Sequence, residues 1–369
     1  MGRYIVGNGS DTWNLADAYA AVVDGDIIEF ERDFSFNLSG DSWVIEKNIT
    51  VCGYVEMNEN GGRMLFSSFY GKIVIAENAD VVIEDMCLYS NKATTTVVVR
   101  KGGKLKLAGS IIGTSVTDND YDLIWNNGGQ LDIDNITLTL EGKSKLIAVT
   151  NKGILNIRNS NNLFMVFSTD SETSIVNSRI INHTGNGINS KQSKLEIIDS
   201  YIEGSPADVE KRYPVVWGGN SKVVIKNSTI IQPQYTTAIF IRDNSSLELE
   251  NSLVSNMGIV GSRAILRDNI ISEVLSIGDF SLCISEGELD IKGENSEKID
   301  IAVDDNSVFS AENLILNRIA YPNVNVFGNS LVRIKELYTE NVDKKDLNFK
   351  TDDLSEIIDL DSLTKEESV

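Results

Sequence analysis

The sequence predicts an all-β solenoid, in which short strands and corners repeat along one axis. Between Ile73 and Ile334 one phrase recurs about twelve times with a mean period of about 23 residues, a spacing typical of repeat architectures. Two or three apolar residues precede a polar break rich in Asn, Gly or Ser, and an apolar, polar, apolar run follows. Because a solenoid grows by stacking, we expect one elongated body.

Each period contains two or three strand-length runs. The third run often begins with Asn-Ser or Asp-Ser, as at Asn177-Ser178, Asp199-Ser200 and Asn227-Ser228. Asn and Asp tolerate the left-handed backbone that a sharp corner requires. Three strands and three corners would form one coil of a triangular prism. Coils stacked about 4.8 Å apart would then pair each strand in parallel with its successor.

Residues 1–30 are expected to form an N-terminal cap. An apolar helical face can begin after an N-cap at Asp11 or Thr12 and end before Gly25, and a strand over 26–30 follows. Such a helix would cover the strand edges that an open solenoid end exposes. The face consists of Leu15, Tyr19, Val22 and Val23.

We expect the solenoid to span residues 31–341 and a charged C-terminal cap or tail to span residues 342–369. The tail contains an apolar set that could form one or two helical turns. This set is Leu354, Ile357, Ile358, Leu360 and Leu363.

The charge balance limits the partners. Asp and Glu number 54 against 33 Lys and Arg, a net charge of -21, and we find no basic stripe that would attract a phosphate backbone. Nucleic acid is therefore not an expected partner, and acidic polysaccharide is disfavoured except at a locally basic site, whereas neutral glycans remain open. No run approaches the roughly 18 apolar residues of a membrane helix, so we expect no membrane insertion.

The compartment stays open. The first residues show no secretory signal, so the protein either stays inside the cell or, if its export signal is missing from this sequence, acts extracellularly or on a virion surface. The three cysteines are expected to be buried thiols.

The period, the corner asparagines and the opening helix before Gly25-Asp26-Ile27-Ile28-Glu29 resemble the right-handed parallel β-helix, or pectin-lyase-like, superfamily. The resemblance covers roughly residues 12–340 and implies a right-handed, single-stranded parallel β-helix of about twelve coils. A β-propeller would need a longer period. The superfamily includes lyases, hydrolases, epimerases, phage tailspikes and inert adhesins, so the resemblance implies no single activity.

Only fragments of one enzyme family's motifs occur. Polygalacturonase-like hydrolases of this superfamily carry Asn-Thr-Asp, Asp-Asp, Gly-His-Gly and Arg-Ile-Lys in that order. Asp304-Asp305 and Arg333-Ile334-Lys335 match two of these by letters, but His183, the only histidine, precedes Asp304 and lacks the glycines. We therefore do not expect this enzyme type. Alternating charges on an exposed strand explain Arg333 and Lys335.

Other groups leave a polysaccharide lyase or glycoside hydrolase open. The catalytic candidates are Asp120 and Asp122 in the densest acidic cluster, the pair Asp132 and Asp134, and His183 as a general base.

Each candidate has a structural alternative. The cluster lacks the Gly and the distal Glu of a calcium loop, so we expect no metal and no cofactor. A lone His in an Asn-rich turn is more often a hydrogen-bonded corner. Asp134 should lie beside Arg158 of the next coil, as in a ladder of alternating charges. A similar pair is Glu248 and Glu250, and Glu250 should lie beside Lys226 in the same way.

Two features suggest a binding face. The first strand of many coils is apolar at consecutive positions, as in 97–99 and 215–217, so one apolar set must point outward. A tail, a loop, a second subunit or a glycan would cover it.

Insertions at 113–122, 203–214 and 232–237 enter at the corner before that strand and can wall a groove. Their side chains suit stacking on a sugar ring, although solvated loops with packed tyrosines are the alternative. The substrate-binding candidates are Tyr121, Tyr213, Tyr235, Lys211, Arg212 and Trp217.

We therefore expect a β-helix that binds or processes a polysaccharide along its shaft, through Asp or Glu if it is an enzyme. The alternative is a non-catalytic structural or adhesive rod whose apolar strand face associates with other chains in an oligomer or assembly.

Overall fold

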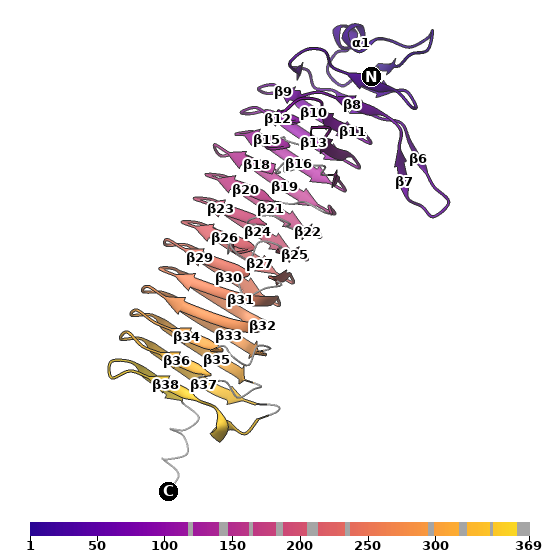
Figure 1. The fold of residues 1–369 in the computed structure, drawn as a ribbon. Helices are drawn as coiled ribbons and strands as arrows, with labels where there is room; N and C mark the ends of the chain where they lie inside the picture. Colours follow the sequence, from indigo (N-terminus) through magenta and orange to yellow (C-terminus); the bar gives the residue numbers. More distant parts are fainter. Residues whose placement is uncertain are drawn as a thin grey trace. The chain divides into compact units, whose positions relative to one another are not determined.

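A computed structural model gives the fold of the chain (Figure 1). It shows an all-β parallel solenoid of about 13 turns with one short helix near the N-terminus, which confirms the predicted fold class. The expected twelve turns were counted from Ile73, and strands of the solenoid precede that residue. The described residues are 1–116, 121–139, 147–161, 165–181, 187–204, 213–232, 237–293, 299–316, 323–339 and 342–359.

The chain divides into two compact units, Met1–Ile180 and Ile181–Val369. Each is described separately below. In the part of the chain that the structure describes, no helix has the length and apolar character needed to cross a membrane.

Unit 1 begins with a strand and a helix. β1 (Arg3–Val6) pairs in parallel with β2 (Ile27–Phe30), and α1 (Leu15–Ala21) connects them. The helix buries Leu15 and Ala18, while Val23, expected on its apolar face, lies beyond its end and is exposed.

The N-cap of α1 differs from the expectation. The sequence indicated Asp11 or Thr12, but the cap is Asn14, whose Oδ1 accepts a hydrogen bond from the Asp17 N–H at 2.9 Å. The helix starts later because the Trp13 N–H donates to a carbonyl of β1 at 2.8 Å, which holds the chain beside that strand as far as Trp13.

Three parallel sheets and one antiparallel hairpin complete unit 1. The first sheet contains β4 (Trp43–Ile45), β9 (Ile73–Ile75), β12 (Val97–Val99), β15 (Ile124–Asn127), β18 (Ile147–Thr150) and β20 (Val166–Thr169). The second contains β1, β2, β5 (Thr50–Cys52), β10 (Asp80–Glu84), β13 (Lys104–Ala108), β16 (Gln130–Asp134), β19 (Ile154–Arg158) and β21 (Glu172–Val176). The third contains β3 (Ser35–Asn37), β8 (Ser68–Tyr70), β11 (Cys87–Ser90), β14 (Ile111–Thr114) and β17 (Thr137–Thr139), with β22 (Arg179–Ile181) at the unit boundary. The hairpin is β6 (Val55–Met57) with β7 (Arg63–Leu65).

Unit 2 repeats the plan, but its later strands run through the corners. Its shorter strands are β23 (Ile188–Lys191), β24 (Lys194–Ile198), β25 (Tyr201–Glu203), β26 (Val216–Gly219), β27 (Lys222–Lys226), β28 (Thr229–Ile231), β29 (Ile239–Arg242), β30 (Ser246–Glu250), β34 (Ile301–Val303), β36 (Val324–Val326), β38 (Phe349–Thr351) and β39 (Glu356–Asp359). The long strands are β31 (Leu253–Val260), β32 (Arg263–Gly278), β33 (Leu282–Ile291), β35 (Val308–Leu316) and β37 (Leu331–Tyr338). Register shifts mark where the long strands bend, for example between Arg267 and Asn269.

The interior is a stack of apolar rungs. Leu105, Leu131 and Leu155 are successive parallel partners in β13, β16 and β19, and all three are fully buried. Their neighbours in sequence point outward, because side chains alternate along a strand. This alternation is what the sequence repeat encodes.

The corners use left-handed backbone, as expected for the Asn and Asp residues of the repeat. Asn159, Asn177, Asn227 and Asn251 have φ values of 51°, 46°, 47° and 47°. The turn is also held from coil to coil, because the Asn177 Nδ2 donates to the Asn159 Oδ1 at 2.7 Å.

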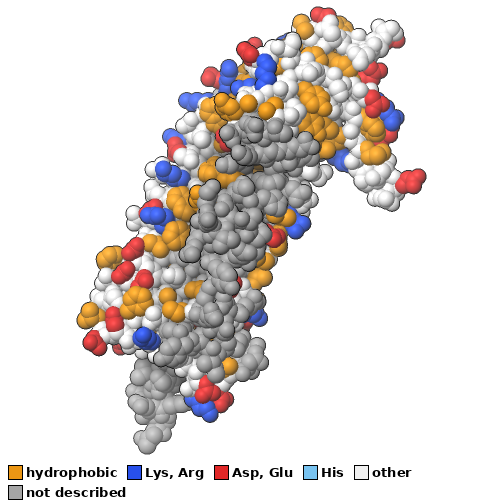
Figure 2. All heavy atoms as spheres, viewed as in Figure 1, with side chains coloured by type: hydrophobic (Ala, Val, Ile, Leu, Met, Phe, Trp, Pro, Cys, Tyr) orange, Lys and Arg blue, Asp and Glu red, His pale blue; other side chains and the backbone are white. Residues whose placement is uncertain are grey.

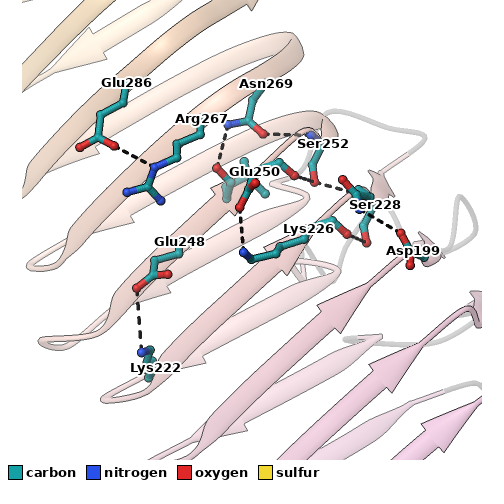
Figure 3. Close-up of polar contacts among 12 residues, drawn as sticks. Asp199, Lys222, Lys226, Ser228, Glu248, Glu250, Ser252, Arg267, Asn269 and Glu286 are labelled. Atoms are coloured by element: carbon teal, nitrogen blue, oxygen red, sulfur yellow. Dashed lines mark hydrogen bonds and ion pairs between the residues drawn. The ribbon is translucent and has the colours of Figure 1, made fainter.

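A buried serine follows most of these corners and links the coils. In unit 2 the Ser200 N–H donates to the Ser228 Oγ at 3.1 Å. The Ser228 N–H donates in turn to the Ser252 Oγ, also at 3.1 Å (Figure 3). The ladder ends where the Ser252 N–H donates to the Asn269 Oδ1 at 3.0 Å. Each hydroxyl therefore satisfies a buried N–H that the corner removes from the sheet.

A second corner carries its own serine ladder, in which each N–H donates to the next Oγ at 2.9 to 3.2 Å. Its members are Ser193, Ser221, Ser245, Ser262, Ser281, Ser307, Ser330 and Ser355.

The helical turns expected near the C-terminus are wrong for the residues that the structure describes. After a 3-10 turn (η1, Lys344–Asp346), β38 pairs with β36 and β39 pairs with β37, so Ile357 stacks beside Val332. Stacked strands therefore continue past residue 341, where we expected the solenoid to stop. Leu360 and Leu363 lie outside the described residues.

Candidate functional site

The first sheet of unit 1 carries aromatic side chains on its outward face. Successive outward partners are Val98, Trp125, Ala148 and Phe167, from β12, β15, β18 and β20. Trp125 is 38% exposed and Phe167 is 36% exposed, although their neighbours Ile124 and Val166 are fully buried. The outward apolar set expected from the sequence is therefore present in unit 1.

The ring of Trp125 is held across the next coil. Its Nε1–H donates to the Thr150 Oγ1 of β18 at 3.2 Å. The outward partner of Trp125 in that strand is Ala148, whose small side chain gives the indole room to cross.

The first sheet of unit 2 repeats this arrangement. Its outward partners are Asn189, Trp217, Phe240 and Gly258, from β23, β26, β29 and β31. Trp217 and Phe240 are both partly exposed.

Glycines let both rings lie close to the backbone. A Cβ added to Gly219 would clash with the six-membered ring of Trp217, and a Cβ added to Gly258 would lie 2.8 Å from the Phe240 ring. Each ring therefore lies close to the backbone beside a glycine, and part of it stays exposed to solvent. We call Trp125 and Phe167 the aromatic face of unit 1, and Trp217 and Phe240 the aromatic face of unit 2.

An exposed tyrosine precedes each tryptophan by four positions. Tyr121 is 57% exposed before Trp125, and Tyr213 is 46% exposed before Trp217. The same spacing, a Tyr four positions before a Trp, thus occurs in both units. Because both tyrosines belong to the predicted insertions, it places those insertions next to the aromatic faces in sequence. Asp122 is described and lies beside Tyr121 in sequence.

Several predicted site residues fall outside the described part of the chain. These are Asp120, His183, Lys211, Arg212 and Tyr235. Phe167, Phe240 and Gly258 were missed, because only the register between coils places them on these faces. Gly219 was also missed, although it follows Trp217 by two residues on the same face of β26.

Asp132 and Asp134, the predicted carboxylate pair, lie on the outward face of β16 among amide groups. The Asp132 oxygens accept from Gln130 Nε2 at 2.8 Å and Asn156 Nδ2 at 2.6 Å. Asp134 accepts from Asn159 Nδ2 at 2.8 Å, and its parallel partner in β19 is Arg158, as expected. The bonds from Asn156 and Asn159 link neighbouring coils, which is a ladder role.

The pair Glu248 and Glu250 also belongs to a ladder, as the sequence predicted (Figure 3). Glu250 binds Lys226 at 2.8 Å and Glu248 lies 3.9 Å from Lys222. The hydrogen bond from Lys226 to Glu250, and then the charge of that carboxylate, raise the pKa of Lys226. Because these side chains are exposed to solvent, such pairs contribute little to stability.

The residues that match hydrolase motifs by letters, Lys335 and Asp304, also have structural roles or positions in the solenoid. Lys335 binds Glu312 at 3.0 Å on the outward face of unit 2. Asp304 lies at a corner, where partial burial and then the charges of Asp305 and Asp279 raise its pKa.

Other reactive groups are few in the described ranges. No cluster of three or more His, Cys, Asp or Glu side chains that could hold a metal ion occurs among the described residues. The thiols of Cys52, Cys87 and Cys283 are free, and burial raises the pKa of each, to about 11 for Cys52. None is therefore an activated nucleophile.

The geometry is suited to holding an extended, ring-containing ligand. Aromatic side chains on a regular sheet face offer stacking surfaces, and the carboxylates of Asp132, Asp134 and Glu250 are already bound within ladders.

Comparison with known proteins adds no assignment to this picture. No protein-family model matches the sequence, and no curated protein matches it significantly. The molecule is defined by its fold class, a parallel β-solenoid.

Proposed function

We propose that this chain is a non-catalytic member of the pectin-lyase-like β-helices that binds a neutral polysaccharide on its aromatic faces. The observation that carries the proposal is the close approach of the partly exposed Trp217 and Phe240 rings to glycine backbone, with Trp125 hydrogen-bonded to the next coil beside Ala148. A ring that packs one face on the sheet can stack its other face on the apolar face of a pyranose.

The net charge of -21 supports a neutral ligand over an acidic one. Tyr121 and Tyr213 are exposed three residues before the same strands, and they can add stacking surface and hydroxyl groups near each aromatic face.

Binding is favoured over processing because of the surroundings of the carboxylates. Asp132 and Asp134 accept hydrogen bonds from amide side chains, and Glu250 binds Lys226. A general acid or nucleophile needs instead a carboxyl that faces the substrate.

Binding to a panel of neutral polysaccharides tests the proposal. We expect affinity electrophoresis to show retardation by at least one of them. Removing one ring by Trp217→Ala should weaken binding about fivefold, since a stacked aromatic contributes on the order of 1 kcal/mol. Tyr338→Ala is the matched control, because Tyr338 is 46% exposed in unit 2 but lies in β37, outside the aromatic face.

Two results would contradict the proposal. Equal affinities of the Trp217→Ala, Trp125→Ala and native proteins would remove the aromatic faces as the site. Release of unsaturated or reducing ends from a polysaccharide would show that the chain is a lyase or hydrolase. The alternative function, a structural or adhesive rod, is favoured by a different surface, which is described next.

A further inference from the structure

The outward face of the second sheet changes character within unit 2. At the first outward position of successive strands the residues of β24, β27, β30 and β32 are Lys194, Lys222, Ser246 and Arg263. In β33, β35 and β37 the same position holds Leu282, Val308 and Leu331. The outward face of the second sheet thus changes from polar to apolar side chains at β33. Outward side chains take no part in the core, so neither the core nor the sheet geometry requires apolar residues at these positions.

These residues form one surface with their neighbours in the second outward position. Ile265 of β32 is the parallel partner of Ile284 of β33, and both are partly exposed like the three residues above. We call Ile265, Leu282, Ile284, Val308 and Leu331 the β33–β37 patch.

A strained aromatic residue borders the patch. Phe280 is 77% exposed and has a φ of 63°, a left-handed conformation that is unfavourable for a bulky side chain. The equivalent corner residues of other coils are Asn244, Asn306 and Asn329, with φ values of 61°, 61° and 62°. An exposed Phe where asparagine is conformationally better indicates a role in contact rather than in folding.

Acidic residues lie on the corner side of the patch. Asp279, Asp304 and Asp305 are close enough for the two other carboxylates to raise the pKa of Asp304, after the effect of its partial burial. Figure 2 shows hydrophobic and acidic side chains together at the left edge of the lower half of the view, where the chain turns from β34 to β35 and from β36 to β37.

Basic residues border the patch along the stack of coils: Arg263 precedes Leu282 in the first outward row, and Arg333 follows Ser310 in the second. Arg263 and Arg333 are exposed on β32 and β37, and neither forms an ion pair with another described residue. Their guanidinium groups are therefore available, whereas the neighbouring Arg267 and Lys335 are already bound to Glu286 and Glu312.

We propose that the β33–β37 patch is the interface through which two copies of this chain associate. Most soluble oligomers are symmetric, and a symmetric dimer uses the same surface of both subunits, so that surface must complement itself. The patch has an apolar centre, mutually repelling carboxylates at its corner and unpaired guanidinium groups at its two ends along the stack, and so meets this requirement. A second copy covers the apolar residues and brings its arginines to the acidic corner.

The proposal is independent of glycan binding, since the patch lies on the second sheet and the aromatic faces on the first. Sedimentation velocity of the whole chain over a range of concentrations tests it, and we expect a species of twice the chain mass.

Two substitutions separate the interface from the fold. Val308→Lys should give a monomer, whereas Val224→Lys, at an outward and partly exposed position of β27 beside two glutamates, should leave the dimer intact. Phe280→Asn installs the residue that other corners use, so it should fold at least as stably and raise the dissociation constant about tenfold.

Charge reversal tests the pairing directly. Two double variants are made: one carries Asp304→Arg and Asp305→Arg, and the other carries Arg263→Asp and Arg333→Asp. Each should be monomeric alone, because like charges then meet across the interface. An equimolar mixture of the two variants should form a heterodimer. A native chain that stays monomeric at every concentration, a Val308→Lys variant that dimerises like the native chain, or a variant mixture that stays monomeric would overturn the proposal.

Discussion

Replacement of one corner asparagine tests how the sequence specifies the coil. Asn227 has a φ of 47°, its N–H donates to the Glu250 carbonyl at 3.0 Å, and its Nδ2 donates to the Asp199 Oδ1 at 3.1 Å. Asn227→Ala removes the side-chain bond and leaves in the left-handed region a residue without the polar side chain that lets Asn adopt it. Asn227→Gly removes the same bond but tolerates that backbone conformation.

The two substitutions should differ by about 1 kcal/mol. Loss of the exposed hydrogen bond costs about 0.5 kcal/mol in both variants. Alanine adds about 1 to 2 kcal/mol of left-handed strain. Glycine adds a smaller cost, about 0.5 kcal/mol, because the unfolded chain gains freedom. We therefore expect losses of about 2 kcal/mol for Asn227→Ala and about 1 kcal/mol for Asn227→Gly.

Urea unfolding followed by far-ultraviolet circular dichroism provides the free energies of unfolding. Asn156→Ala is the control, since Asn156 also donates its Nδ2 to an aspartate of the preceding coil but lies in the middle of β19. If the alanine variant of Asn227 were as stable as the glycine variant, left-handed corners would not explain the recurring asparagines.

Three further predictions follow from the interior and the ladders. Leu131→Ala should lower the free energy of unfolding, measured with urea, by about 3 kcal/mol, because it opens a cavity between two leucine rungs. The control is Ile154→Ala, at a residue that is 41% exposed, and it should lower this free energy by less than about 1 kcal/mol. Cys283, whose pKa is raised by complete burial, should not react with a thiol reagent at pH 8 until the chain unfolds, as measured by absorbance; rapid reaction in the native state would contradict this. The hydrogen bond from Lys335, and then that from the Gly287 N–H, lower the pKa of Glu312 in the folded protein. The Glu312 carboxylate therefore stabilises the fold at pH values above its unfolded-state pKa, and this stabilisation is lost as the pH falls through its folded-state pKa. Glu312→Gln should therefore lower the melting temperature at pH 7 but not at pH 3, and an equal loss at both values would exclude the ion pair as the cause.

The period and the corners could be predicted from sequence because both are local. Alternating apolar residues such as Leu105 and Leu107 determine which side chains face the interior. Asn177 and Asn227 mark the corners because few other residues adopt left-handed backbone without cost.

Features that depend on pairing between coils were missed. Serines such as Ser228 and Ser252 read as ordinary polar corner residues, and only stacking shows that their hydroxyls accept from the N–H groups of neighbouring coils. Ile357 and Ile358 suit a helix or a strand equally well, and pairing with β37 decides for the strand.

The candidate site was predictable in part. Two adjacent apolar residues at Val216 and Trp217 require one of them to face outward, and Trp217 does so. The register that places Phe240 beside Trp217, and Gly258 beneath Phe240, comes from strand pairing and is invisible in one sequence.

The most direct test of glycan binding is the fluorescence of Trp217 alone. The chain has 4 tryptophans, so replacement of Trp13, Trp43 and Trp125 by Phe leaves this one as the reporter. On titration with a polysaccharide that retards the native protein, we predict a blue shift and protection of Trp217 from acrylamide quenching. Binding measured by calorimetry without any change at Trp217 would contradict the placement of the ligand on the aromatic face of unit 2.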